Sequence, residues 1–436
     1  MIPREEIRTK TIIIVPFIRE KRHEGGEWSQ LEEAVGLAEA IDLSILAREI
    51  VNIAKPKPST LLGSGKVEEI AEKIADLGIE LAVVDGSLSP VQQRNLEKAW
   101  NCKVIDRTAL ILEIFGRRAR TKEGVLQVEL AHLNYQKGRL VRSWTHLERQ
   151  RGGTGFLGGP GETQIEADRR ELQDKIVRIK RELETVVKTR KLHREKRQKT
   201  PYPVVALVGY TNAGKSTLFN RLTGADVLAK DMLFATLDPT LRRLKLPHGD
   251  TIILSDTVGF ISKLPTHLVA AFRATLEEVT EADLILHVRD MSDTENAAHA
   301  EDVIKILKEL NVDVDDPKHI IEVWNKIDLL ADNVRIANSL AAQSSTIPAF
   351  PISAHSGAGL DSLLLAIEKQ ISGTIKHQKI TLKPYNLTLL DWIYDNASSV
   401  TRKDCENGDV IVEVDLTQAA QLILDTKMKQ AHKPLD

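Results

Sequence analysis

Apolar and polar residues alternate in short blocks along the first quarter of the chain. Within residues 10–107, four apolar runs predict strands, and three amphipathic stretches between them predict helices. The strands are expected at 11–16, 46–53, 81–85 and 103–105, and the helices at 30–41, 67–77 and 91–100. Such alternation of strand and helix favours a small parallel α/β domain over residues 1–107.

The pattern becomes almost wholly helical over residues 108–150. Residues 152–161 follow with six glycines and a proline, which exclude a helix and predict a flexible loop. Beyond the loop, apolar residues recur at the spacings of a coiled-coil seam, at Leu172, Ile176, Ile179, Leu183 and Val186. Residues 108–200 are therefore expected to form an antiparallel helical hairpin with the glycine-rich loop at its tip.

A second pattern of strands and helices covers residues 201–372. Strands are expected at 204–208, 251–254, 320–324 and 350–352, and a helix at 216–222. This pattern predicts an α/β domain with a mostly parallel sheet and flanking helices. Residues 373–378 are expected to be a linker. The remaining elements predict a small α+β domain over 373–436, with a helix at 387–394, a strand at 410–414 and a helix at 418–429.

The turn after the strand at 204–208 carries a phosphate-binding sequence. Residues 209–216 read Gly-Tyr-Thr-Asn-Ala-Gly-Lys-Ser and fit the pattern G-x-x-x-x-G-K-[S/T], between a predicted strand and a predicted helix. In such a P-loop, backbone N–H groups surround the β-phosphate of a nucleotide. Lys215 is expected to reach the β- and γ-phosphates, and the Ser216 hydroxyl is expected to hold Mg²⁺.

A second motif, Asn325-Lys326-Ile327-Asp328, follows the predicted strand at 320–324. Ligands of open α/β sheets bind at the carboxyl ends of the strands. A carboxylate at Asp328 can accept hydrogen bonds from both guanine N1–H and the exocyclic amine, so it favours GTP over ATP. Ser353-Ala354, after the strand at 350–352, is expected to place a backbone contact near guanine O6.

Two further segments are expected to complete the phosphate and Mg²⁺ site. Asp256-Thr257-Val258-Gly259 is a D-x-x-G sequence, in which Asp256 holds Mg²⁺ through water and the Gly259 N–H faces the γ-phosphate. Within residues 233–240, Thr236 is the expected switch threonine that completes the Mg²⁺ shell, and Thr240 is the alternative. This order of motifs resembles the GTPase domains of translation factors.

The expected site comprises catalytic, nucleotide-binding and metal-binding residues. Lys215, Thr236 and Gly259 are the expected catalytic residues, and Ser216, Thr236 and Asp256 (through water) are the expected Mg²⁺ ligands. The residues expected to contact GTP or GDP are Gly209, Tyr210, Thr211, Asn212, Ala213, Gly214, Lys215, Ser216, Thr217, Phe234, Ala235, Thr236, Asp256, Thr257, Val258, Gly259, Asn325, Lys326, Asp328, Ser353, Ala354 and His355.

Phe260 stands directly after the D-x-x-G motif, where Ras-like enzymes carry a glutamine that orients water. A phenyl ring cannot orient water by hydrogen bonding. Intrinsic hydrolysis is therefore expected to be slow, and a partner is expected to complete the site.

Length and composition bound the class of protein. The 436 residues are enough for two to four domains, and a net charge of −2 predicts no polyanionic partner by itself. Cys102 and Cys405 are far apart and form no C-x-x-C motif, which suits a reducing cytosol. No apolar run approaches the ~18 residues of a membrane span, and the N-terminus lacks a signal-peptide pattern. These features predict a cytoplasmic chain.

Positive charge is concentrated in the second half of the hairpin. Residues 170–200 contain twelve Lys and Arg against five Asp and Glu. Two interpretations stay open: a solvated helix face, or a basic hairpin that enters a polyanionic cleft and contacts phosphates without regard to sequence. Structured RNA is the natural partner for the second. A second phosphate loop at 61–67 is disfavoured, because Val67 stands where Ser or Thr is required.

Several of these segments together resemble the HflX family of bacterial GTPases. The resemblance rests on residues 209–217, 233–240 and 256–261 in the GTPase domain, and outside it on Arg-Ala-Arg-Thr-Lys-Glu-Gly at 118–124, Gln-Val-Glu-Leu-Ala at 127–131 and Gly-Gly-Pro-Gly-Glu-Thr-Gln at 158–164. It implies a GTPase that binds the large (50S) ribosomal subunit and its ribosomal RNA, and that splits stalled ribosomes under stress. It also implies that the hairpin reaches toward the peptidyl-transferase region.

The same motifs fit two other functions. An assembly scaffold would bind immature large subunits through pre-ribosomal RNA, with hydrolysis as a slow clock. A signalling GTPase that grips a protein partner would leave the basic hairpin unexplained. DNA is not expected as a partner, no membrane span is expected, and a membrane or protease partner stays open. The free chain is expected to be a monomer.

Overall fold

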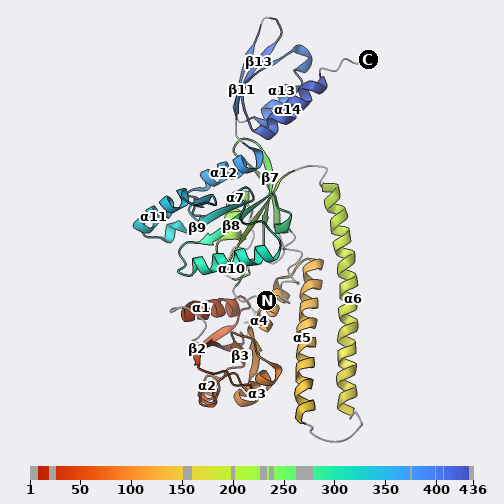
Figure 1. The fold of residues 1–436 in the computed structure, drawn as a ribbon, viewed down its shortest axis with the longest axis vertical. Helices are drawn as coiled ribbons and strands as arrows, with labels where there is room; N and C mark the ends of the chain where they lie inside the picture. Colours follow the sequence, from red (N-terminus) through yellow and green to blue (C-terminus); the bar gives the residue numbers. More distant parts are fainter. Residues whose placement is uncertain are drawn as a thin grey trace, which may run out of the picture. The chain divides into compact units, whose positions relative to one another are not determined.

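The computed structural model describes residues 8–18, 26–150, 160–197, 202–225, 233–234, 240–261, 278–373, 376–397, 399–405 and 407–431. Contacts divide the chain into two compact units (Figure 1). The first unit holds the described residues before 200 together with Leu233, Phe234 and Ile261. The second unit holds the other described residues.

The first unit begins with a parallel four-stranded sheet, as the alternating pattern predicts. The strand order is β2-β1-β3-β4, with bounds β1 Lys10–Ile18, β2 Ser44–Ile53, β3 Leu81–Val84 and β4 Lys103–Asp106. Its helices are α1 Gly26–Glu39, α2 Ser64–Leu77 and α3 Pro90–Trp100. The sheet residues Ile12, Val84 and Val104 form one core with Ile70 and Leu96 from the helices. Val67, the residue that disfavours a second phosphate loop, belongs to the same core.

Three helices follow: α4 Arg107–Arg118, α5 Lys122–Gln150 and α6 Pro160–Arg197. The coiled-coil prediction is confirmed, because the five seam residues of α6 pack against Leu126, Leu130 and Leu133 of α5. The two helices run side by side in opposite directions (Figure 1). Residues 152–159 of the predicted tip loop lie outside the described residues. The loop was predicted two residues too long, since α6 begins at Pro160, and proline is tolerated in a first helical turn because no N–H is needed there.

The second unit contains a six-stranded sheet of order β10-β9-β8-β5-β7-β6, in which only the β6–β7 pair is antiparallel. The strands are β5 Val204–Gly209, β6 Thr240–Lys245, β7 Thr251–Asp256, β8 Leu284–Asp290, β9 Ile320–Asn325 and β10 Ala349–Pro351. Described helices are α7 Lys215–Thr223, α10 Asn296–Glu309, α11 Asp332–Gln343 and α12 Leu360–Ser372. Leu207, Leu286 and Val323 pack against Phe219 of α7 and Leu363 of α12. The expected mostly parallel sheet is confirmed, while β6 and β8 were not predicted.

The same unit ends in a small α+β fold. An antiparallel sheet of order β11-β13-β12 is formed by β11 Lys376–Leu382, β12 Val400–Asp404 and β13 Val410–Leu416, and its helices are α13 Leu389–Asn396 and α14 Gln418–Ala431. The predicted linker at 373–378 is wrong for its last three residues. They belong to β11, whose polar positions alternate with buried Ile380 and Leu382.

Two further properties bear on the class of protein. Among the described residues, no helix is both long enough and apolar enough to cross a membrane. Cys102 and Cys405 are both free and half-buried. Burial raises the pKa of the Cys102 thiol to about 11, so this thiol stays protonated and unreactive at neutral pH.

Candidate nucleotide-binding site

The loop at 209–214 joins β5 to α7 and needs its glycines for two different reasons. A Cβ on Gly209 would lie 2.2 Å from the carbonyl oxygen of Val288 on the neighbouring strand β8. Gly214 has a φ of +91°, and its Cβ would lie 2.2 Å from the Asn325 Nδ2 atom. Both positions therefore exclude a side chain, and the loop stays close to the carboxyl edge of the sheet.

Lys215 is buried at the start of α7 and faces its own loop. Its Nζ donates to the carbonyl oxygens of Gly209 at 3.0 Å and Tyr210 at 2.8 Å. Burial lowers the pKa of Lys215 to about 8, and the charge of Asp256 opposes that shift. A buried ammonium with only neutral carbonyl acceptors is poorly compensated, so an incoming phosphate is a favourable replacement for them.

Two expected Mg²⁺ ligands meet beside this lysine. The Ser216 hydroxyl donates to Asp256 Oδ2 at 2.7 Å, and Asp256 is fully buried at the end of β7. A hydroxyl and a carboxylate held together are the oxygen donors that Mg²⁺ prefers. Thr236 and Ala235 lie outside the described residues, so their expected roles stay predictions. The alternative, Thr240, is the first residue of β6 and pairs with Asp256 in the sheet register.

The D-x-x-G segment lies directly against the P-loop. A Cβ on Gly259 would be 2.8 Å from Thr211 Cγ2 and 3.1 Å from Lys215 Nζ. The Thr211 N–H donates to the Phe260 carbonyl at 2.7 Å, and the Phe260 N–H donates to the Gly209 carbonyl at 3.1 Å. Thr211 Oγ1 is buried and has no hydrogen-bond partner in the part of the chain that the structure describes. The Gly259 backbone is thus held within reach of the expected γ-phosphate position.

The side chains of the residues around Gly259 are buried within the protein. Thr257 Oγ1 donates to the Leu207 carbonyl at 2.5 Å, and Val258 is buried. The Phe260 ring is 4 % exposed. Any contact of Thr257 or Val258 with a nucleotide must therefore come from the backbone, and Phe260 offers no polar group to a water molecule.

Asn325 connects the segment expected to read the base, residues 325–328, to the P-loop. Its Nδ2 donates to the Ala213 carbonyl at 2.8 Å, and its Oδ1 accepts from the Ala354 N–H at 2.9 Å. Lys326 adopts a φ of +63° and pairs with Asp290 at 2.7 Å. Asp328, in the short 3-10 helix Ile327–Leu329, is exposed, and it makes no hydrogen bond or ion pair with any other described residue. Its carboxylate is therefore free to accept hydrogen bonds from a guanine base.

The remaining expected residues lie on the rims of the same edge. Asn212 and Thr217 are exposed at the loop and at the start of α7, and His355 is exposed after β10. Ser353 is fully buried and accepts the Ser356 N–H at 3.0 Å, which closes the turn that carries Ala354.

Phe234 has a different environment from the P-loop residues. Its ring packs edge-on against Phe115 of α4, with centroids 4.9 Å apart, and is 3 % exposed. Its neighbour Leu233 touches α1, because a Cβ on Gly36 would lie 3.2 Å from Leu233 Cδ1. The side chain of Phe234 is buried in this contact. Its expected contact with the nucleotide stays a prediction.

One aromatic contact of the P-loop was not predicted. The Tyr210 ring stacks on the ring of His299 in α10, with centroids 3.8 Å apart. His299 carries no sequence motif, and the strand before it, β8, was not predicted either. Only the three-dimensional arrangement brings the two rings together.

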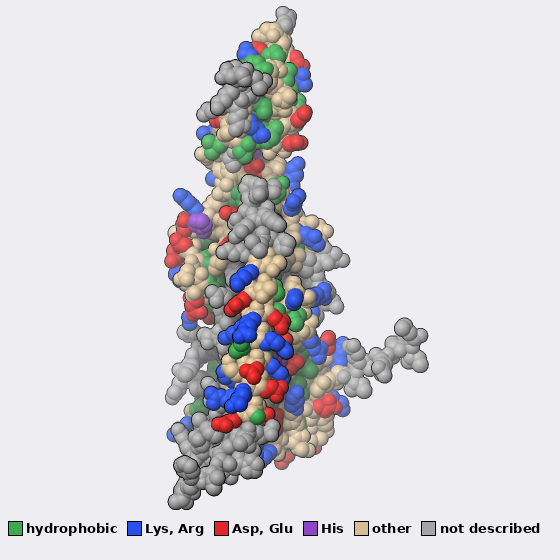
Figure 2. All heavy atoms as spheres, turned by 90° about the vertical axis from the view of Figure 1, so that its right-hand side faces the viewer, with side chains coloured by type: hydrophobic (Ala, Val, Ile, Leu, Met, Phe, Trp, Pro, Cys, Tyr) green, Lys and Arg blue, Asp and Glu red, His purple; other side chains and the backbone are tan. Residues whose placement is uncertain are grey.

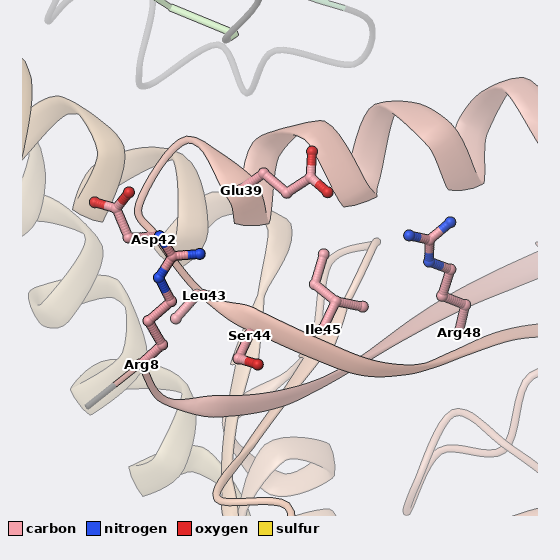
Figure 3. A pocket seen from close by; sticks show the side chains of 7 residues that line it. All are labelled: Arg8, Glu39, Asp42, Leu43, Ser44, Ile45 and Arg48. Atoms are coloured by element: carbon pink, nitrogen blue, oxygen red, sulfur yellow. The ribbon is translucent and has the colours of Figure 1, made fainter. Parts of the chain in front are cut away.

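A separate hollow of about 400 Å³ lies in the first unit, lined by Arg8, Glu39, Asp42, Leu43, Ser44, Ile45 and Arg48. Figure 3 shows the Glu39 side chain between the two arginines. The charges of two positive and two negative side chains nearly cancel there. The hollow contains none of the expected site residues.

Comparison with known proteins agrees with this geometry. Four family models match successive parts of the chain: a GTP-binding GTPase N-terminal region at 28–116, a GTP-binding GTPase middle region at 118–197, a 50S ribosome-binding GTPase at 204–326 and an HflX C-terminal domain at 338–436. GTPase HflX of Magnetococcus marinus is 50 % identical over 382 residues, which cover 88 % of this chain and 87 % of that protein. The chain belongs to the HflX family of GTPases.

GTPase HflX of Escherichia coli is 47 % identical over 360 residues, covering 82 % of this chain and 83 % of that protein. Among solved structures, a GTP-binding protein from Sulfolobus solfataricus in complex with GDP is 24 % identical, covering 83 % of this chain and 98 % of that one with a TM-score of 0.45. Membership of the HflX family and the match to a GTPase domain model identify the chain as a GTP hydrolase that binds GTP and GDP.

Proposed function

We propose that this HflX-family GTPase binds the large ribosomal subunit in its GTP form and couples hydrolysis to the dissociation of stalled ribosomes under stress. The family model matched by residues 204–326 is described as a 50S ribosome-binding GTPase, which supports a ribosomal partner. Within this proposal two of the predicted domains have separate tasks. Residues 201–372 bind the nucleotide, and the hairpin at 108–200 enters the ribosomal RNA.

The observation that carries the proposal is a set of unpaired cations on α6. Lys175 and Arg178 pair with Glu171 and Glu182 on the same helix. In contrast, five exposed cations have no ion pair within the described part of the chain, namely Arg169, Arg170, Lys180, Arg181 and Lys188. Figure 2 shows Lys and Arg side chains along this face, interspersed with Asp and Glu. Cations that make no ion pair within the protein are free to contact phosphates.

Three of these cations share one face of α6. Arg170, Arg181 and Lys188 are spaced by 11 and 7 residues, close to whole numbers of helical turns, and they lie on the side of α6 away from its apolar seam. A row of cations along a straight helix suits the backbone of structured RNA, which proteins recognise mainly by shape.

The nucleotide site supplies the chemistry for this cycle. Lys215 and the backbone N–H groups of residues 212–215 would hold the phosphates, and Asp328 would select guanine. Ser216, Asp256 and Thr236 would hold Mg²⁺, which neutralises charge on the β- and γ-phosphate oxygens when it is bound. The Gly259 N–H would donate to the γ-phosphate. Water then attacks in line, assisted by positioning and electrostatics.

The alternative is an assembly GTPase that binds immature large subunits. It uses the same nucleotide site and the same cations, so its substrate is what separates it from a splitting factor. A splitting factor acts on mature ribosomes, whereas an assembly factor prefers incomplete subunits.

The first test is the GTP hydrolysis rate of the purified chain with and without mature large subunits, across a salt series. Strong stimulation that high salt removes is expected. An Arg170→Ala/Arg181→Ala/Lys188→Ala variant should lower the salt slope of subunit binding by about two. The matched control, Lys175→Ala/Arg178→Ala, removes cations that are already paired and should change the slope less. Absence of stimulation by mature subunits would contradict the proposal, and stimulation by immature subunits alone would favour the assembly function.

A further inference from the structure

The second residue of the P-loop makes an aromatic contact outside the loop. Tyr210 stacks on His299, with ring centroids 3.8 Å apart and planes inclined by 12°. His299 lies in the first turns of α10, and Tyr210 follows β5. Stacking at this distance fixes the positions of two side chains that are 89 residues apart in the sequence.

The His299 ring is itself held in place from the loop that precedes α10. Its Nδ1 pairs with Asp293 Oδ2 at 3.0 Å, and the other oxygen of Asp293 accepts the Glu295 N–H at 2.9 Å. The hydrogen bond from His299 holds the pKa of Asp293 below its usual value. The stacking partner of Tyr210 is therefore an oriented ring on a regular element.

The main chain of Tyr210 connects two parts of the hydrolytic site. Its carbonyl accepts the Lys215 ammonium at 2.8 Å. It also forms a parallel bridge with Phe260, whose N–H and C=O bond to the residues on either side of Tyr210. Phe260 directly follows Gly259. The position of the Tyr210 backbone therefore determines the positions of both the Gly259 N–H and the Lys215 ammonium.

We propose that Tyr210 and His299 are positioning residues for GTP hydrolysis. Their stack fixes the backbone at 209–211, and that backbone aligns the Gly259 N–H and the Lys215 ammonium on the γ-phosphate. Phe260 supplies no polar group to the attacking water, so backbone alignment carries more of the transition-state stabilisation here than in enzymes with a glutamine. The proposal rests on GTP hydrolysis alone and requires no ribosomal partner.

The stack is expected to affect hydrolysis more than nucleotide binding. GDP lacks the γ-phosphate, so its affinity does not depend on where Gly259 lies, and it shares only the β-phosphate contact of Lys215 with GTP. Loss of the stack should therefore lower kcat by more than it weakens GDP binding.

The experiment uses the full chain without ribosomes and measures single-turnover hydrolysis and GDP affinity. Tyr210→Ala and His299→Ala should each lower the rate roughly two- to tenfold, the value of an aromatic pair, with the Kd for GDP within about twofold. Tyr210→Phe keeps the ring and should restore the rate. The double alanine variant should be no slower than the worse single variant, because both remove one interaction. His319→Ala is the matched control, since His319 is an exposed histidine of the same unit that pairs with Asp316.

Wild-type rates in both alanine variants would overturn the proposal. Additive losses in the double variant would also overturn it, because the two residues would then act separately. A parallel loss of GDP affinity and hydrolysis would show that the pair only holds the loop together, and this outcome too would reject a role in positioning.

Discussion

The ring of Phe234 meets the ring of Phe115 edge-on, with planes inclined by 84°. Both rings are almost fully buried, and Phe234 adopts a φ of +56°, a conformation that is costly for a bulky residue. Packing against Phe115 offsets that cost. The residue two positions before the expected switch threonine is thus held in the same compact unit as the N-terminal sheet.

Phe115→Ala is expected to destabilise the chain by about 3–5 kcal/mol, because it leaves a cavity and also removes the support of the strained Phe234. Phe115→Leu should cost less, since most of the volume stays filled. Urea unfolding of the two variants and the parent chain measures the difference. A loss below about 1 kcal/mol in the alanine variant would show that Phe234 repacks without Phe115.

Lys215 makes the stability of the nucleotide-free chain depend on pH. Its pKa is about 8 in the folded chain and about 10.5 when unfolded, so the unfolded state binds more protons between these values. Stability from this group therefore rises with pH from about 8 to 10.5, by up to about 3 kcal/mol. Comparing unfolding free energies of the parent chain and Lys215→Met across this range isolates the effect. Parallel pH curves for the two proteins would contradict the buried-ammonium interpretation.

Lys215→Met should also abolish turnover. The expected fall is at least about a hundredfold, because the ammonium stabilises charge that develops on the phosphates. Hydrolysis at the parent rate would refute the assignment of the P-loop.

Asp328→Asn is expected to shift nucleotide preference from guanosine toward xanthosine. The new amide can donate to the xanthine carbonyl, whereas it no longer accepts both guanine donors. Competition between GTP and XTP for the site measures the shift. Asp332→Asn, four residues further along and also exposed, is the matched control and should keep guanine selectivity. Unchanged selectivity in Asp328→Asn would refute its base-reading role.

Asn325→Ala is expected to cost about 2–4 kcal/mol of stability, since it leaves the Ala213 carbonyl and the Ala354 N–H buried without their partner. GDP affinity should fall with it, because the P-loop and the base-reading turn lose their common tether. Thermal unfolding and GDP titration measure the two effects. Asn333→Ala, on the exposed face of α11, should be nearly neutral.

Sequence reasoning predicted the parts of the site whose structure depends on residues close together in the chain. Gly214 needs a positive φ, Lys215 and Ser216 follow it directly, and the strand before the loop is a plain apolar run. The seam of α6 was likewise predictable, because its spacing depends only on helical geometry.

The features that were missed depend on contacts between residues far apart in the sequence, or on strands whose apolar pattern is interrupted. In β8, His287 and Arg289 interrupt the apolar run. His287 is buried, and burial lowers its pKa to about 4, so it is neutral within the sheet at pH 7. No local pattern relates Phe234 to Phe115 or Tyr210 to His299. Those contacts arise only when elements more than 80 positions apart pack together.

The length of α6 has a mechanical consequence. The helix spans 38 residues, which corresponds to about 57 Å at the rise of an α-helix. A stiff rod of this length amplifies motion, so a rotation of about 5° at one end displaces the other by about 5 Å. The apolar seam with α5 supports the rod between Leu172 and Val186. A rotation this small need not disturb any single packing contact at one end of α6. At the other end, it moves the helix by about the length of an amino-acid side chain.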